Sequence, residues 1–244
     1  MKHKKDLDFL KGLYIAHRGL HDNNGPAPEN SMPAFENAAA RNIPIEFDLH
    51  LLKDNKIAVF HDDNLKRMTG SDKNIKDCTY DEIKNLKLLK TDCAIPLFEE
   101  LLDFVNGKVL LDIEFKTDIK AGLLEEKASL LLDNYKGKFI VKSFSPFSVQ
   151  WFKQHRPGFI RGQLSYDFIG EDSISPLTKF ICKNMLLNPV AKPDFIAYGL
   201  QSLPSKKVAY LRRRGKPIFV WTINGSADLE KAKQYGDSFI FNSL

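Results

Sequence analysis

Cysteine is scarce in this chain of 244 residues. The three cysteines, Cys78, Cys93 and Cys182, lie far apart and show no CxxC or Cys/His ligand spacing. Such a set is unlike a disulfide framework or a zinc cluster, so we expect reduced thiols and a cytoplasmic protein. A core of this size needs no cross-link to be stable.

Long apolar runs are also absent. After the charged start Met1–Lys5, the residues Asp6, Asp8 and Lys11 interrupt the apolar positions, so neither a signal peptide nor an integral membrane segment is expected. No GxGxxG or GxxxxGK[ST] motif follows an apolar run. This excludes the usual ligand sites of open parallel sheets.

Charge of one sign barely dominates, with 36 Lys and Arg against 31 Asp and Glu and a net charge of +5. The balance favours an anionic small-molecule substrate and allows weak peripheral contact with anionic lipid head groups. No basic stripe is interleaved with aromatic residues, so no nucleic-acid partner is expected. The dense cluster Arg212-Arg213-Arg214 ends an expected helix, where its charges complement the helix dipole in solvent. The sequence leaves the oligomeric state open.

Apolar runs of strand length recur along the chain, with amphipathic helical patterns between them. The expected barrel strands are Leu13–His17, Ile43–Leu49, Val109–Glu114, Phe139–Ser143, Ile160–Leu164, Phe195–Ala197, Pro217–Trp221 and Ser238–Phe241. The expected helices are Ser31–Arg41, Tyr80–Leu86, Phe98–Val105, Leu123–Tyr135, Pro146–His155, Ser173–Lys183, Ser205–Arg214 and Ala227–Tyr235, with Ser145 and Ser226 as caps of two of them. This alternation predicts an α/β TIM (β/α)8 barrel, with a doubly wound open sheet as the alternative. Without a linker or repeat, residues 1–244 are expected to form a single domain.

The stretch from about residue 54 to residue 96 departs from the simple alternation. Ile57–His61 resembles an extra strand that pairs back on the second barrel strand through a turn at Asp54-Asn55. Polar loop follows. We interpret this stretch as a small insertion between the second and third barrel strands, over the carboxyl mouth of the barrel.

Acidic side chains recur on two neighbouring strands. Because side chains alternate along a strand, Glu46, Asp48 and His50 share one face, and Glu114 and Lys116 share a face of the next barrel strand. For one such strand a polar outer face is an equally good interpretation. The repeat on the next strand favours the barrel interior, where Glu46, Asp48 and Glu114 would converge on a hard divalent cation, Mg²⁺ or Ca²⁺.

Two histidines and an arginine end neighbouring strands. His17 and Arg18 end the first barrel strand, and His61 ends the extra strand. One histidine can accept a proton while the other donates one to a leaving alkoxide. Metal, Arg18 and Lys116 can stabilise charge on phosphoryl oxygens. The set predicts cleavage of a phosphate ester.

Five motifs occur in order along the chain and resemble the glycerophosphodiester phosphodiesterase family. They are His17-Arg18-Gly19, Pro28-Glu29-Asn30-Ser31, Glu46-Phe47-Asp48, His61-Asp62 and Glu114-Phe115-Lys116, supported by Trp221-Thr222-Ile223-Asn224. The resemblance implies a TIM-barrel hydrolase of lipid and glycerol metabolism that uses a divalent metal. Its expected substrates are glycerophosphodiesters, which it cleaves to sn-glycerol 3-phosphate and an alcohol.

The resemblance also implies a role for each matched residue. His17 and His61 would be the acid–base pair, and Glu46, Asp48 and Glu114 the metal ligands. Residues that hold the phosphate or order the site would be Arg18, Glu29, Lys116 and Trp221. The chain departs from the family at Leu52 and Asn55, usually threonine and glycine, and in the end Ile240–Leu244, which lacks the usual Thr-Asp-x-Pro.

Two alternatives remain at this stage. A lysophospholipase D would need an apolar lip, which could come from Phe144, Phe147, Phe168 and Phe180. A non-catalytic barrel that binds a phosphodiester would be expected to have lost one of the two histidines or three acids, and all five are present.

Overall fold

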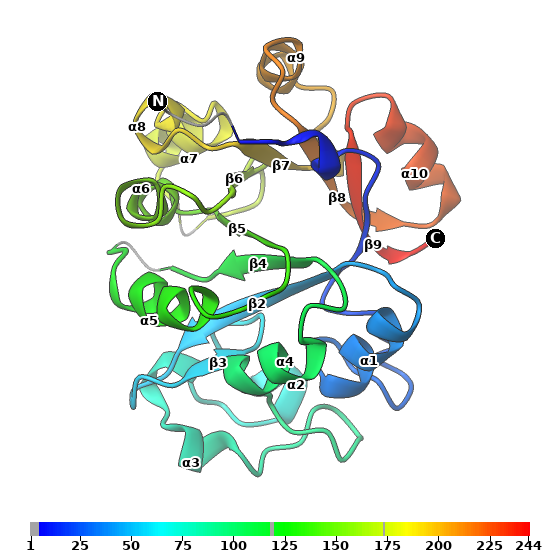
Figure 1. Cartoon of the computed structure of the whole chain (residues 1–244), viewed down its shortest axis with the longest axis vertical. Coiled ribbons are helices and arrows are strands. Elements are labelled where there is room, and N and C mark those ends of the chain that lie inside the picture. Colours follow the sequence, from blue (N-terminus) through cyan, green and yellow to red (C-terminus); the bar gives the residue numbers. More distant parts are fainter. Residues whose placement is uncertain (1–4, 118–119, 173) are drawn as a thin grey trace. The chain divides into compact units, whose positions relative to one another are not determined.

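Strands and helices alternate in the order predicted for a (β/α)8 barrel (Figure 1). The computed structural model describes residues 5–117, 120–172 and 174–244. The strands are β1 (Tyr14–Ala16), β2 (Ile45–Leu51), β3 (Ile57–Val59), β4 (Leu111–Phe115), β5 (Phe139–Ser143), β6 (Arg161–Ser165), β7 (Phe195–Gly199), β8 (Ile218–Asn224) and β9 (Ser238–Ser243). β3 is the extra antiparallel strand, and the other eight follow the parallel barrel order. The fold class is the TIM barrel, and the open doubly wound sheet is wrong.

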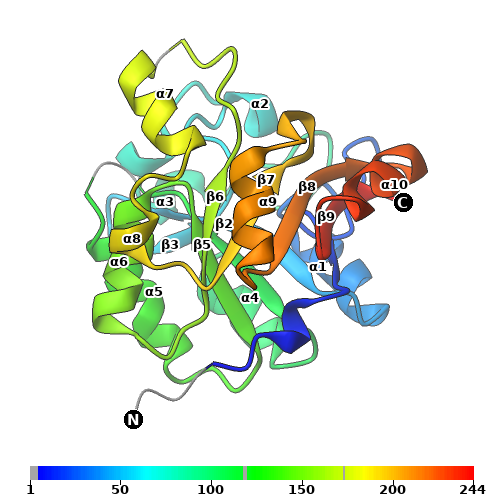
Figure 2. The same ribbon diagram turned by 90° about the horizontal axis from the view of Figure 1, so that it is seen from above.

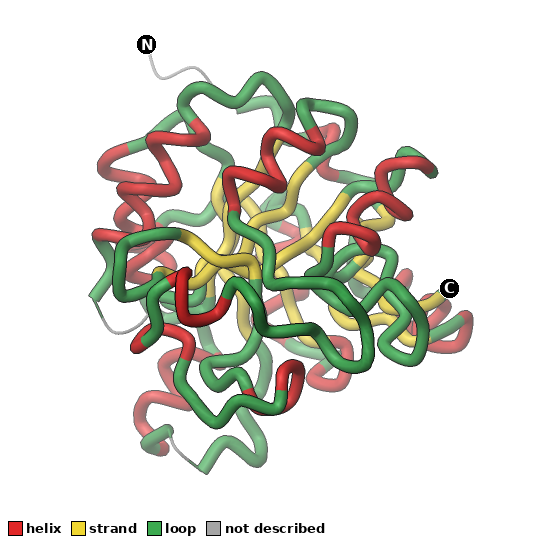
Figure 3. The backbone as a smooth tube through the Cα atoms, turned by 90° about the horizontal axis from the view of Figure 1, so that it is seen from below, coloured by secondary structure: helices red, strands yellow, loops and turns green. Residues whose placement is uncertain are grey.

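Helices follow or precede these strands along the tube of Figure 3. The α-helices are α1 (Met32–Ala40), α2 (Lys66–Thr69), α3 (Tyr80–Ile83), α4 (Phe98–Val105), α5 (Leu123–Leu132), α6 (Pro146–His155), α7 (Pro176–Lys183), α8 (Asn188–Ala191), α9 (Lys206–Arg213) and α10 (Ser226–Lys233). The 3₁₀ turns are η1 (Asp8–Leu10), η2 (Ile75–Asp77) and η3 (Leu200–Ser202). No helix in the described ranges is both long and apolar enough to cross a bilayer.

The chain divides into two compact units. The N-terminal unit is Ala16–Ile140, and the C-terminal unit combines Met1–Ile15 with Val141–Leu244. Each unit has its own strands and helices.

In the N-terminal unit, β2 is the strand on which the others assemble. β1 pairs with it in parallel at Ile45, and β4 pairs with it in parallel over the whole of its own length. β3 pairs antiparallel with the last residues of β2, beyond the end of β1. This register places Asp48 opposite Glu114. The two acidic strands are therefore neighbours.

The helix α1 shows why the local sequence folds as it does. Ser31 is its N-cap, and the Ser31 hydroxyl oxygen accepts a hydrogen bond from the Ala34 amide at 3.3 Å. A proline follows in the first turn, where its missing N–H costs nothing. Ala34, Phe35 and Ala38 are buried on one face, as a helical period requires.

The stretch between β2 and β4 has a small apolar core of its own. The turn before β3 uses Asn55 with φ 65°, a left-handed conformation that asparagine tolerates in place of glycine. The core of the stretch between β2 and β4 consists of Leu52, Ala58, Phe60, Leu65, Met68, Ile75, Cys78, Ile83, Leu88 and Ile95. The expected helix over Tyr80–Leu86 is one turn only and ends at Ile83. Apolar packing of short turns, rather than long helices, holds this stretch together.

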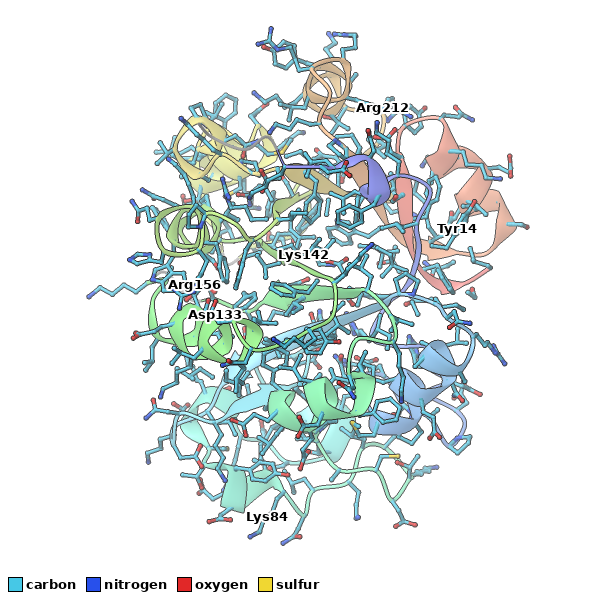
Figure 4. All side chains as sticks on the ribbon, viewed as in Figure 1. Tyr14, Lys84, Asp133, Lys142, Arg156 and Arg212 are labelled. Carbon is cyan, nitrogen blue, oxygen red and sulfur yellow. The ribbon has the colours of Figure 1, made fainter. Side chains whose placement is uncertain are left out.

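In the C-terminal unit, β5, β6, β7, β8 and β9 pair in parallel, each with the next (Figure 2). The Phe239 amide of β9 donates to the carbonyl of Leu13. Arg212, labelled in Figure 4, binds Asp237 at 2.9 Å and also donates to backbone carbonyls. The arginine cluster is thus more than a solvated helix end, because one of its members ties α9 to the start of β9.

The observed ends of the helices differ from the predicted ends more than the positions of the helices along the chain do. Pro146–His155 and Phe98–Val105 begin and end as predicted. Ser226 is the first residue of α10 and Gly225 is its N-cap, so the predicted cap is wrong by one residue. The expected start of α7, Ser173, lies outside the described residues, and the helix begins at Pro176.

Candidate active site

Three carboxylates from two neighbouring strands come together in the N-terminal unit. Glu46 and Asp48 of β2 and Glu114 of β4 each offer an oxygen, and these oxygens lie within 4.8 Å of one another. The three residues are 1%, 1% and 6% exposed. A polar outer face is therefore wrong for both strands, because these side chains are buried.

Positive charge lies directly beside the carboxylates. The Lys116 ammonium is 3.0 Å from Asp48 Oδ1 and 2.5 Å from Glu114 Oε1. Burial acts to raise the pKa of Asp48, but neighbouring charges, Lys116 first, hold it well below its usual value. Burial likewise acts to lower the pKa of Lys116, and the two carboxylates outweigh it and raise that pKa. Asp48 is thus an anion and Lys116 a cation at neutral pH.

Asn30 extends the set of oxygens at this cluster. Its Nδ2 donates to Asp48 Oδ2 at 2.9 Å, and its backbone has φ 54°. Its Oδ1 is buried and has no hydrogen-bond partner in the described part of the chain. A buried oxygen of this kind is costly unless a donor or a cation meets it. Asn30 therefore supports the fit of a hard cation beside Asp48.

The first motif places Arg18 by means of the backbone. The Arg18 amide donates to Glu46 Oε2 at 3.0 Å, and the residue has φ 56°. Gly19 follows with φ 82°, and a Cβ there would lie 2.8 Å from the carbonyl carbon of Ala34. Only glycine fits this turn. The tight turn directs the Arg18 guanidinium towards Glu29, whose Oε1 is 2.5 Å from Arg18 Nη1.

Glu29 sits between two guanidinium groups. Burial acts to raise its pKa, but hydrogen bonds from Arg67 and the charge of Arg18 lower it to about 2. Asn23 adds a further hydrogen bond at 2.8 Å. Glu29 therefore stays ionised and orders Arg18, which itself lies 3.7 Å from Asp48.

Both predicted acid–base histidines lie in this unit. His17 is largely buried, with Nε2 at 3.9 Å from Glu46 Oε2. His61 is about one-third exposed, and its Nδ1 lies 2.7 Å from Asp62 Oδ1. That contact fixes the ring and leaves Nε2 for proton transfer. His50, to which the sequence assigned no role, has Nε2 3.1 Å from the His61 carbonyl oxygen.

Arg67 is a residue that the sequence analysis missed. It belongs to α2, in the stretch interpreted as an insertion. Its guanidinium binds Asp62 at 2.7 and 3.0 Å and Glu29 at 2.7 and 2.9 Å. Its position six residues after His61 was the available signal, but a one-turn helix gives no periodicity that would tell Arg67 from a solvated arginine.

Trp221 is the one predicted site residue in the C-terminal unit. It is on β8 and packs edge-on against Phe144 and Tyr166, with ring centroids 5.7 and 5.9 Å away. Its indole Nε1 is buried and has no acceptor among the described residues. The structure thus leaves a donor on Trp221 available, and its role stays a prediction.

The fold and the acidic site together define a β/α-barrel phosphodiesterase. The model of the glycerophosphoryl diester phosphodiesterase family matches residues 17–242, and the chain belongs to this family. The non-catalytic barrel is therefore not supported.

Several individual proteins are similar to the chain. A glycerophosphodiester phosphodiesterase of Bacillus altitudinis is 33% identical over 64% of the chain and 67% of its own length. A lysophospholipase D of Rattus norvegicus is 26% identical over 96% of the chain and 84% of its length. A phosphodiesterase of Oleispira antarctica, solved with the product sn-glycerol-3-phosphate, has a TM-score of 0.78 at 20% identity. That likeness covers 96% of the chain and 94% of the Oleispira protein, and it shows the shared fold.

Proposed function

We propose that the chain hydrolyses glycerophosphodiesters to sn-glycerol 3-phosphate and an alcohol. The observation that carries this proposal is the buried cluster Glu46, Asp48 and Glu114 with Arg18 and Lys116 beside it, in a chain of this family. Carboxylates suit a hard cation, and the two cations suit the oxygens of a phosphodiester. The Oleispira protein of the same fold binds sn-glycerol 3-phosphate, which fits the expected product.

A divalent cation, Mg²⁺ or Ca²⁺, would be held by Glu46, Asp48 and Glu114, and all-oxygen donors suit either ion. When bound, the ion would polarise the phosphoryl group and offset the charge of the carboxylates. Lys116 and Arg18 would bind phosphoryl oxygens from the protein side. Glu29 would order Arg18.

The two histidines would share the proton transfers. His61 would donate a proton from Nε2 to the leaving alkoxide, because Asp62 engages Nδ1 and leaves Nε2 for proton transfer. His17 would accept a proton from the attacking oxygen, beside the carboxylate of Glu46. The attacking group would be water or, in a first step, the glycerol hydroxyl, which would give a cyclic phosphate that water then opens.

The direct test is release of glycerol 3-phosphate from glycerophosphocholine, glycerophosphoethanolamine and glycerophosphoglycerol, with Mg²⁺ or Ca²⁺ added. Turnover of at least one of them at a rate abolished by Asp48→Ala would support the proposal. Arg213→Ala, at an exposed position of α9, is the control variant and should keep the activity of the wild type. Absence of product from all three, in the presence of either metal, would contradict it.

Lysophospholipase D activity is the second candidate, and one observation favours it. In the C-terminal unit, Ile169, Leu177 and Phe180 are 79%, 69% and 59% exposed, and Phe147 is 49% exposed. Exposed apolar side chains of this size suit an acyl chain or a lipid surface better than water. Phe168, by contrast, is buried. A strong preference for lysophosphatidylcholine over the three water-soluble esters would favour this candidate.

We also propose that the protein is cytoplasmic. Cys78, Cys93 and Cys182 are free thiols, which supports a reducing compartment such as the cytoplasm. A small-molecule substrate needs no protein partner.

A further inference from the structure

A cavity of about 330 Å³ in the N-terminal unit borders the candidate site. Two of its lining residues also belong to the site. Lys116 pairs with Asp48 and Glu114, and the His50 ring lies against the His61 carbonyl. The cavity is therefore next to the acidic cluster, through Lys116, and next to His61, through His50. Its volume falls in the range of small-ligand pockets.

The wall of this cavity is rich in positive charge. Its charged lining residues are Lys53, Lys76, Lys116, Lys120, Asp63 and Glu125. Lys53 and Lys120 are exposed, so their ammonium groups can move to meet a ligand. The exposed lysines outnumber the one exposed carboxylate, Asp63.

The second carboxylate of the lining, Glu125, is engaged within the protein. It is fully buried in the first turn of α5. The Thr117 hydroxyl donates to its Oε1 at 2.5 Å, and the Gly122 amide donates to its Oε2 at 2.7 Å. Both oxygens are thus engaged in holding the helix start, as in a capping arrangement. Among the residues that the structure describes, the four lysines of the lining outnumber its two carboxylates, so the formal charge of the lining is positive.

We propose that this cavity is a subsite for a leaving alcohol that carries its own negative charge, as a carboxylate or a second phosphate. The proposal rests on the proposed function, with His61 as the group that protonates the leaving alkoxide. Asp63 lines the cavity two residues after His61, so the cavity lies on the leaving-group side. The lysines then distinguish anionic from neutral or cationic alcohols, since a matched charge is worth most in a partly enclosed site.

Glycerophosphoserine and glycerophosphoethanolamine form a matched pair of probes, because their alcohols differ by one carboxylate. At low ionic strength kcat/KM for the serine ester should exceed that for the ethanolamine ester by about tenfold, the gain of one partly screened ion pair. The ratio should fall towards one as salt is raised, because ions screen exposed charges. Equal kcat/KM values at low salt would overturn the subsite.

Substitution of the exposed lysines connects the preference to this cavity. The variant with Lys53→Ala and Lys120→Ala should reduce the serine-to-ethanolamine ratio by roughly fivefold to tenfold. Lys53→Glu changes the charge of the lining by the same two units and should reduce the ratio by a similar factor. Lys90→Ala, an exposed lysine that does not line the cavity, should keep the wild-type ratio. A ratio that survives in both cavity variants overturns the subsite alone, whereas failure to release glycerol 3-phosphate from either ester overturns the proposed function with it.

Discussion

Replacement of Arg67 by methionine removes a guanidinium that bridges Glu29 and Asp62. Arg67 makes two hydrogen bonds to each carboxylate, at 2.7 to 3.0 Å. Asp62 in turn holds His61 Nδ1 at 2.7 Å. Both carboxylates raise the pKa of Arg67, so this bridge is charged at any working pH. Methionine keeps much of the apolar stem and removes only the charged fork.

The magnitude follows from the exposure and from the role of Asp62. Hydrogen bonds to charged groups contribute roughly 1.5–3 kcal/mol when buried, but the Arg67 side chain is 46% exposed and solvent screens it. We expect Arg67→Met to lower the free energy of unfolding by only about 1–2 kcal/mol. Loss of the group that orients a catalytic ligand or base typically costs about 10- to 100-fold in activity. The larger effect should therefore be on turnover.

The assay compares two substrates that need the general acid to different extents. With glycerophosphocholine, kcat should fall by about 10- to 100-fold in Arg67→Met. With a p-nitrophenyl ester of glycerol 3-phosphate, kcat should fall by about threefold or less, because the p-nitrophenolate group can leave without being protonated. On glycerophosphocholine, the kcat of Arg67→Lys should lie between those of the wild type and of Arg67→Met. Lys66→Met is the control, because neighbouring Lys66 is exposed and pairs only with Asp72 among the described residues.

Two results would refute this reasoning. Equal losses on both substrates would mean that Arg67 acts through Glu29 on phosphate binding and not through Asp62 on His61. No loss on either would mean that the bridge has no part in the reaction. A double-mutant cycle with Asp62→Asn tests the pathway directly, because only the mechanism in which Arg67 acts through Asp62 on His61 requires Arg67 and Asp62 to be coupled.

Other predictions test the metal, the histidines and the carboxylates. Excess chelator, or Glu46→Ala or Asp48→Ala, should abolish hydrolysis of glycerophosphocholine; full activity with no metal bound would contradict the metal site. His61→Ala should lose at least about a hundredfold on glycerophosphocholine and far less on the p-nitrophenyl ester, while His17→Ala should lose on both; selective rescue of His17→Ala would reverse the two roles. The pKa of Glu29 falls from 4.5 to about 2, so its stabilisation is present above pH 4.5 and is lost as pH falls towards 2. Urea unfolding should show wild type more stable than Glu29→Gln by about 3 kcal/mol at pH 6, with the difference vanishing near pH 2; a gap that does not change with pH would show that the ionised carboxylate is not its cause.

Much of the fold was readable from local patterns. Strand-length apolar runs and amphipathic helices gave the strand order, and Ser145 before Pro146 marked the start of α6 at the correct residue. The Glu46–Asp48 alternation, repeated on β4, was enough to expect converging carboxylates, because side-chain direction in a strand depends only on sequence parity. Helix ends were less certain. At Gly225 and Ser226, either residue type can cap a helix, and only the backbone conformation decides between them.

The sequence by itself determined the elements whose signals are local, namely the strands, most of the helices, and the face on which each strand carries its acids. Only the tertiary structure decided which distant side chains meet. Arg67 contacts Glu29 across 38 residues, and the cavity is lined by lysines from the β2–β3 turn, η2 and the loop before α5. The physical reason is that these contacts depend on how short turns pack on their own apolar core, and no periodicity along the chain encodes that packing.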